Sequence, residues 1–95
     1  MPAYVIADIE ITDPSGYKRY AEQAPPTIAA HGGRHLARGG AVQTLEGEWR
    51  PQRLVILEFE SVEAAQRWHS SEEYAEPKAL RQRTSRGSFV VLEGL

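Results

Sequence analysis

Apolar and polar residues alternate in three stretches of the chain, and this period of two predicts β-strands. From Ala3 to Ile11 every odd position is apolar, so one face of that strand is expected to be buried. The stretch Arg53–Glu60 opens with apolar residues on both faces, and Ser88–Leu95 closes the chain as a last strand with apolar residues on both faces. The pattern therefore predicts a sheet with apolar surroundings on both sides.

Apolar positions spaced by three and four predict a helix after the first strand. Asp13 supplies an N-terminal cap, and Pro14 suits the first helical position. The apolar stripe of this helix consists of Tyr17, Tyr20, Ala21, Ala24 and Ile28. We expect a kink or a break at Pro25–Pro26, because each proline removes a backbone hydrogen bond. Gly32 is expected to end the helix with a left-handed cap.

A second helical region is predicted between the strand Arg53–Glu60 and the last strand. Ser61 caps its start, and its apolar positions are Val62, Ala65 and Trp68. In the segment SSEE, Ser70 and Glu73 are expected to cap another turn reciprocally. Pro77 leaves the course of that turn open.

The segment HGGRHLARGG holds four glycines between the first helix and the next strand. Arg34–Arg38 is expected to form a short strand, Gly39–Gly40 a bulge or bend, and Ala41–Glu46 the continuation of the strand. We interpret the glycines as architectural. Arg38 beside the bend is expected to be aimed at a site, because bulges redirect side chains and often lie next to sites.

These elements follow in the order β-α-β-β-α-β, which predicts a ferredoxin-like α+β fold. Right-handed crossovers place both helices on one face of a four-stranded antiparallel sheet. The other face then carries Ile6, Leu54 and Ile56, or their neighbours of opposite parity, with no helix over them. An uncovered apolar face is typical of an interface or a ligand cavity, so we expect a homodimer.

Composition limits the other partners of the chain. Its 95 residues suit a single domain, 1–95, with a modest core. There is no cysteine, and the net charge of −2 is spread over both signs, so neither thiolate chemistry nor nucleic-acid binding is expected. The segment MPAYVIADIEI lacks the features of an export or membrane signal, so we expect no membrane partner and a cytoplasmic location.

The segments PPTIAAHGGRHLARGG, EGEWRPQRLVILEFES and WHSSEEY…ALR resemble a bacterial family known as domain of unknown function 1330. This resemblance spans nearly the whole chain. The family belongs to the dimeric α/β-barrel superfamily, so the resemblance implies a ferredoxin-like domain that pairs sheet against sheet with a second copy. Superfamily relatives include cofactor-independent monooxygenases, isomerases, decarboxylases, haem-degrading enzymes and stress-response proteins. The resemblance therefore implies a fold and a dimer but no established activity, and Pro77 departs from the family's pattern in the helix before ALR.

Charged residues suggest a site beside the sheet or at the dimer interface. Glu58 shares a strand face with apolar residues, where a carboxylate needs a cation. Arg38 on the neighbouring strand, or Arg53 or Arg81, would supply that partner. The pair is either a structural ion pair or part of a ligand site, in which Arg38 holds an anion and Glu58 or His31 is the general base.

Aromatic residues would complete such a site. Tyr20, Trp49, Trp68 and Tyr74 either wall a small pocket or belong to the core and interface. In the first case they would join Arg38 and Arg81 in binding a small anionic or aromatic ligand.

The histidines do not predict a metal site. His31 and His35 are four residues apart, but the glycines between them break the helix that would present both as ligands. His69 is expected at the surface or in a capping contact. Neither a phosphate-binding loop nor a nucleophile elbow is present, and nothing favours haem, so no cofactor is expected.

Two functions fit these features. The first is a cofactor-independent enzyme that acts on a small organic acid or aromatic molecule, with its site lined by Arg38, Glu58 and aromatic residues. The second is a non-catalytic, ligand-binding or stress-related dimer in which the same residues are structural. An open cavity and a carboxylate with a perturbed pKa would favour the enzyme, whereas a filled, dry interface would favour the second function.

Overall fold

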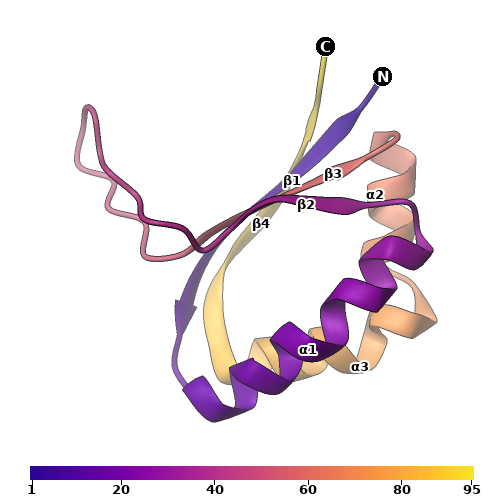
Figure 1. Ribbon diagram of the computed structural model, residues 1–95, viewed down its shortest axis with the longest axis horizontal. Helices are drawn as coiled ribbons and strands as arrows, with labels where there is room; N and C mark the ends of the chain where they lie inside the picture. The colour runs from indigo at the N-terminus through magenta and orange to yellow at the C-terminus, as the bar shows by residue number, and fades with distance from the viewer.

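A computed structural model describes all residues from 1 to 95. Its elements follow the predicted order, with the second helical region divided in two (Figure 1). They are β1 (Ala3–Ile11), α1 (Pro14–Ala30), β2 (Arg34–Arg38), β3 (Leu54–Phe59), α2 (Val62–His69), α3 (Glu72–Thr84) and β4 (Ser85–Glu93). None of the three helices has the length and apolar character that crossing a membrane requires.

The four strands form one antiparallel sheet in the order β2-β3-β1-β4. All three helices lie on the same side of this sheet (Figure 1). β1 is central, and its Val5 is paired with Leu57 of β3 and Val91 of β4. This arrangement confirms the predicted ferredoxin-like α+β fold.

Side chains of one parity on each strand face the helices and form the core. On β1 this parity is the fully apolar one that begins at Ala3, and β3 adds Leu57 and Phe59. The largest side chains that are almost fully buried are Trp68, Tyr74 and Phe59. Because these three come from α2, α3 and β3, a single aromatic cluster joins the helical layer to the sheet.

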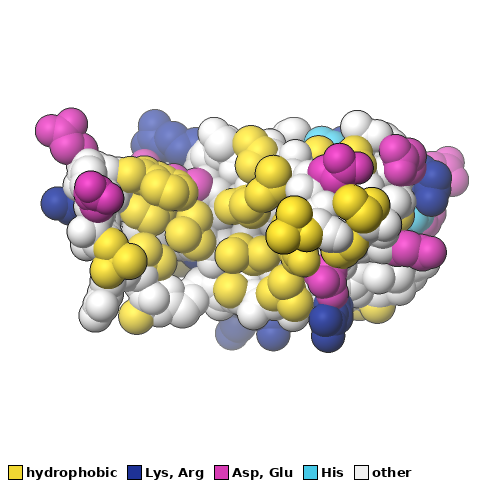
Figure 2. Space-filling view, turned by 90° about the horizontal axis from the view of Figure 1, so that it is seen from above, with side chains coloured by type: hydrophobic (Ala, Val, Ile, Leu, Met, Phe, Trp, Pro, Cys, Tyr) yellow, Lys and Arg dark blue, Asp and Glu magenta, His cyan; other side chains and the backbone are white.

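The opposite parity forms a face that no helix covers, which we call the open face. Its apolar side chains are Tyr4, Ile6, Leu54, Ile56, Val90 and Leu92. Val90 and Leu92 are both 54 % exposed. Hydrophobic side chains spread across the middle of the surface in Figure 2. The sequence prediction of apolar residues on both faces of the central strands is therefore confirmed.

Helix α1 begins and ends as predicted but is not broken at its prolines. The Asp13 side chain accepts a hydrogen bond from the Gly16 amide, and Gly32 adopts a φ of 77°. The amides of Gly32 and Gly33 donate to the carbonyls of Ala29 and Ile28, which are the paired bonds of a Schellman motif. Helical structure continues through Pro25–Pro26, so the predicted break with a restart does not occur.

Two features allow α1 to remain continuous. The prolines delete donors that would bond to the carbonyls of Ala21 and Glu22, neither of which is a buried residue. Solvent can satisfy those carbonyls, while buried Ala24 and Ile28 hold the helix against the core on both sides of the proline pair.

The second helical region is capped one residue later than predicted. Ser71, not Ser70, accepts the hydrogen bond from the Tyr74 amide and begins α3. Ser70 instead ends α2, where its amide donates to the Gln66 carbonyl. Because Ser70 is needed to close one helix, its neighbour starts the next. Pro77 lies inside α3 without interrupting it.

The prediction that the second strand continues over Ala41–Glu46 is wrong. β2 ends at Arg38, and the last bond beyond it runs from the Gly39 amide to the Leu54 carbonyl. β3 begins at that same Leu54, so the residues before it offer no strand for 41–46 to pair with. Residues 39–53 instead form an extended arm that projects beyond the sheet (Figure 1).

Replacing Gly32 with valine should lower the free energy of unfolding by about 1 to 3 kcal/mol, because a β-branched residue is strained at positive φ. No atom within 4 Å would obstruct the new side chain, so the effect isolates backbone strain. Gly40→Val is the matched control, since Gly40 also has open space and lacks a positive φ. Equal urea midpoints for the two variants would contradict the capping role.

Candidate functional site

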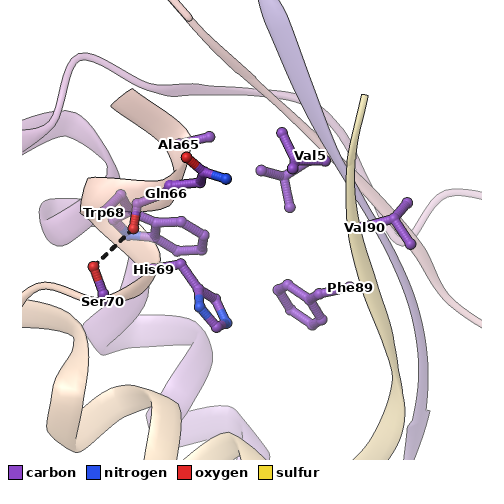
Figure 3. A pocket seen from close by; sticks show the side chains of 9 residues that line it. Val5, Ala65, Gln66, Trp68, His69, Ser70, Phe89 and Val90 are labelled. Atoms are coloured by element: carbon purple, nitrogen blue, oxygen red, sulfur yellow. Dashed lines mark hydrogen bonds between the residues drawn. The ribbon is translucent and has the colours of Figure 1, made fainter. Parts of the chain in front are cut away.

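A cavity of about 410 Å³ lies between α2 and the strands β1 and β4 (Figure 3). Its lining is mostly apolar and consists of Val5, Ala65, Gln66, Trp68, His69, Ser70, Phe89, Val90 and Val91. Volumes of about 300 to 1,000 Å³ are typical of small-molecule sites, and such sites combine apolar walls with a few polar groups. We call this space the α2 cavity.

The spacing of residues on α2 explains which of its side chains reach the cavity. Ala65, Trp68 and His69 are separated by three and four positions, so they lie on one face of the helix. Facing them, Val5 and Phe89 belong to the strand parity that points toward the helices. α2 has only eight residues, about 12 Å of helix, and it leaves part of β4 uncovered.

Trp68 is a rigid wall of the cavity. Its indole N–H donates to Thr27 Oγ1 over 3.0 Å, and its ring lies 4.2 Å from that of Tyr74 and 5.5 Å from that of Phe59, measured between centroids. The side chain is fully buried. The predicted ligand-binding Trp68 therefore lines a cavity and also belongs to the core, so both sequence interpretations apply to it.

His69 is the ionisable residue that lines the cavity. Its imidazole faces the Phe89 ring across the hollow, with 6.4 Å between centroids (Figure 3). Burial, with the positive charges of Lys78 and Arg81, lowers the pKa of His69 below the usual 6.5. The ring is therefore neutral at pH 7, and neither of its nitrogens is hydrogen-bonded to another group of the chain.

The expectation that His69 lies at the surface or in a capping contact is met only in part. Its ring is half-buried, and only its backbone carbonyl serves a capping contact, accepting from Lys78 Nζ at 2.9 Å. A signal for this position exists in the sequence, because His69 follows Ala65 by four residues on the apolar side of the predicted helix. The distance between α2 and β4, which creates the hollow, has no such signal.

A buried polar chain lies behind the cavity. The hydroxyls of Tyr20 and Tyr74 share a hydrogen bond of 2.7 Å, and Arg81 Nε donates to the Tyr74 hydroxyl over 3.3 Å. Burial raises the pKa of both tyrosines, so both remain protonated. The Arg81 guanidinium carbon stands 4.0 Å from the centroid of the Phe89 ring, and Arg81 is only 9 % exposed. Of the predicted ligand residues, Tyr20 and Arg81 thus support the cavity from behind.

Arg38 and Glu58, predicted to share a pocket, lie on opposite faces of the sheet. Glu58 is on the open face, where its carboxylate accepts a hydrogen bond of 2.8 Å from Arg34 Nε. Arg38 is paired with Val55, whose parity faces the helices. Neither Arg53 nor Arg81 lies within 4.0 Å of Glu58, so Arg34 is the partner that the sequence analysis did not consider.

A β-bulge is the reason for this separation. The register of β2 against β3 shifts by one residue between His35 and Ala37, not at Gly39–Gly40 as predicted. Without the shift Arg38 would alternate onto the same face as Arg34 and Glu58. With it, Arg38 turns to the helical side.

The remaining predicted residues lie away from the α2 cavity. His31, at the end of α1, bonds to Glu73 of α3 with 2.8 Å between Nε2 and Oε1. This hydrogen bond lowers the pKa of the Glu73 carboxyl. Trp49 is in the arm, 60 % exposed, and its indole N–H donates to Asp8 Oδ2 over 3.0 Å. No group of three or more acidic residues and histidines is arranged to hold a metal ion.

Comparison with known families agrees with this architecture. The family model described as "Domain of unknown function (DUF1330)" matches residues 2–95. The chain belongs to the DUF1330 family. No curated protein matches this DUF1330 chain in sequence.

Solved structures share the fold of this DUF1330 member. A protein of unknown function from Rhodopseudomonas palustris is similar with a TM-score of 0.79 and 18 % identity, over 99 % of this chain and 82 % of that one. SnoaB, a cofactor-independent oxygenase from Streptomyces nogalater, is similar with a TM-score of 0.69 and 8 % identity, over 99 % and 93 % of the two chains. An antibiotic biosynthesis monooxygenase follows with a TM-score of 0.56 and 15 % identity, over 100 % and 99 %. At these identities the likeness establishes the fold alone.

The stability of the protein should fall as the pH is lowered from about 7.5 to 5.5. His69 and His35 both have pKa values below 6.5 in the folded chain, because burial and neighbouring cations oppose their protonation. The unfolded chain therefore binds more protons in this range, and acid favours unfolding. Urea unfolding at several pH values should give a smaller loss for His69→Gln than for the natural sequence. An unchanged pH dependence would contradict the proposed environment of His69.

Proposed function

We propose that this chain is a cofactor-independent enzyme that acts on a small aromatic molecule or organic acid bound in the α2 cavity, with His69 as the general base. The observation that carries the proposal is the half-buried, neutral imidazole at an apolar cavity of about 410 Å³. Phe89 and Val91, which are partly exposed in the lining, would contact the rings of the substrate. Gln66 and Ser70 are polar groups in the same lining and would orient it.

The first step of the proposed reaction is a proton transfer from the substrate to His69. A neutral imidazole nitrogen would accept it from an acidic O–H or C–H group of the substrate, which leaves an anion in the cavity and an imidazolium on His69. The positive charges of Arg81 and Lys78 lie close enough to depress the pKa of His69, so they would also stabilise the substrate anion. The proposal therefore places the base at His69 instead of Glu58 or His31.

The likeness of the fold to SnoaB, named a cofactor-independent oxygenase, supports chemistry of this class without supplying a substrate. A non-catalytic ligand-binding protein with the same cavity is the competing function. The two functions differ in one measurable respect, because only the enzyme removes a proton from its ligand.

Exchange of the acidic C–H protons of 2-tetralone in deuterated buffer, followed by proton NMR, measures proton abstraction directly. The protein should accelerate this exchange at neutral pH, and His69→Gln should reduce the acceleration by about 100-fold or more. Val91→Trp should also reduce it, because Val91 lines the cavity from a partly exposed position where a larger ring would fill the space.

His35→Gln is the matched control for this experiment. His35 is also partly buried with a lowered pKa, but it does not line the α2 cavity. Its variant should exchange 2-tetralone like the natural protein. Binding of 2-tetralone in the cavity without any acceleration would favour the non-catalytic function and refute the enzyme.

We further propose that the chain acts as a homodimer that pairs through the open face. Ile6, Ile56 and Val90 are adjacent across three strands of that face, and no helix covers them. The arm adds further exposed apolar side chains, Leu45 and Trp49. Covering these groups with the same face of a second copy removes apolar surface from water on both partners.

A stable dimer of this kind should bury about 1,200 to 2,000 Å² in total. Ile56→Asp should dissociate it and lower its stability strongly, because an unpaired charge would enter the interface. Ala79→Asp adds the same charge on the exposed side of α3 and should leave the dimer intact. Sedimentation of the natural protein as a folded monomer at micromolar concentration would refute the dimer.

A further inference from the structure

Three basic side chains gather on the helical side of the sheet at a place distinct from the α2 cavity. His35 and Arg38 come from β2, and Arg53 directly precedes β3. All three line one small hollow of about 30 Å³, which is closed on the other side by α1. The β-bulge of β2 is what brings Arg38 to this face.

No acidic group compensates these charges. The ion pairs of the chain are His31–Glu73, Arg34–Glu58 and Arg86–Glu10, and neither Arg38 nor Arg53 takes part in one. Arg53 Nε is buried and has no hydrogen-bond partner, the one such side-chain atom in the chain. Buried donors normally have a partner, so an orphaned guanidinium nitrogen indicates a missing acceptor.

The surroundings hold Arg53 in place. Its guanidinium carbon lies 5.5 Å from the centroid of the Tyr17 ring, and its backbone carbonyl accepts from the Ile9 amide at 2.9 Å. Gly39 has a φ of 71°, and a Cβ at that position would overlap Arg53 Nη1. The glycine therefore allows the guanidinium to lie directly against the backbone of the chain.

We infer that His35, Arg38 and Arg53 form a binding site for the carboxylate group of a small organic acid. Guanidinium forks match the planar, two-oxygen geometry of a carboxylate. The hollow of about 30 Å³ has no room for a whole ligand, and a planar carboxylate group is smaller than a tetrahedral phosphate. His35 has a pKa lowered by burial and by both arginines, so its neutral ring can accept or donate a further hydrogen bond.

This site does not depend on catalysis in the α2 cavity, although Phe89 borders both spaces. An acid bound at the arginines is held by its charge, whereas a molecule in the α2 cavity contacts mainly apolar walls.

Calorimetric titration at low salt with benzoate, benzamide and inorganic phosphate tests the inference. In the Val91→Trp variant, whose α2 cavity is filled, benzoate should bind and benzamide should not, because the amide lacks the negative charge. Arg53→Gln and Arg38→Gln should each weaken benzoate binding by about tenfold or more. Arg67→Gln is the matched control, since it removes one exposed, unpaired charge from α2 and should leave the affinity unchanged.

Val91→Trp distinguishes this site from the α2 cavity, because it should abolish proton exchange on 2-tetralone and leave benzoate binding intact. Arg38 is exposed, so its variant remains informative if Arg53→Gln fails to fold. Equal affinities of the natural protein and Arg38→Gln for benzoate would overturn the inference. Tighter, Arg53-dependent binding of phosphate would overturn the assignment to a carboxylate.

Discussion

The structure depends on a mismatch between one four-stranded sheet and the helices available to cover it. Three helices lie on one face, and the shortest, α2, has eight residues. The covered face is therefore incomplete next to β4, and the open face is bare (Figure 1). The first deficiency creates the α2 cavity, and the second leaves Ile56, Val90 and Leu92 without a helix over them.

The alternation of side chains along each strand decides which charged residues lie on each face of the sheet. Glu58 falls on the open face and is neutralised by Arg34, whereas a one-residue shift in β2 sends Arg38 to the helical side. The helical side consequently collects several cations and no carboxylate in contact with them. Burial, together with the positive charges of Lys78 and Arg81, lowers the pKa of His69 and keeps its imidazole neutral beside the cavity. The proposed carboxylate site and the proposed general base thus both lie on the side of the sheet where cations gather.

Features with local causes could be predicted from the sequence. The alternation of Ala3–Ile11, the Asp13 cap and the left-handed Gly32 each depend on neighbours within a few residues. The bulge in β2, the end of that strand and the hollow beside His69 depend instead on partners distant in the sequence. Which serine ends α2 and which begins α3 also depends on where α2 ends; Ser70 takes the first role and Ser71 the second. Trp68 could be predicted as a pocket wall or a core residue, but the space between α2 and β4 that makes it both could not.

Measuring the protonation of His69 tests most directly whether a neutral imidazole contacts a ligand in the α2 cavity. Imidazole nitrogen shifts of the histidines, recorded by NMR from about pH 5 to 8 with and without 2-tetralone, report both protonation and ligand contact. We expect His69 to titrate below 6.5 and its nitrogen shifts to respond to 2-tetralone. The nitrogen shifts of His31, which bonds to Glu73, should not respond to 2-tetralone. An ordinary titration of His69 with no response to 2-tetralone would contradict this expectation.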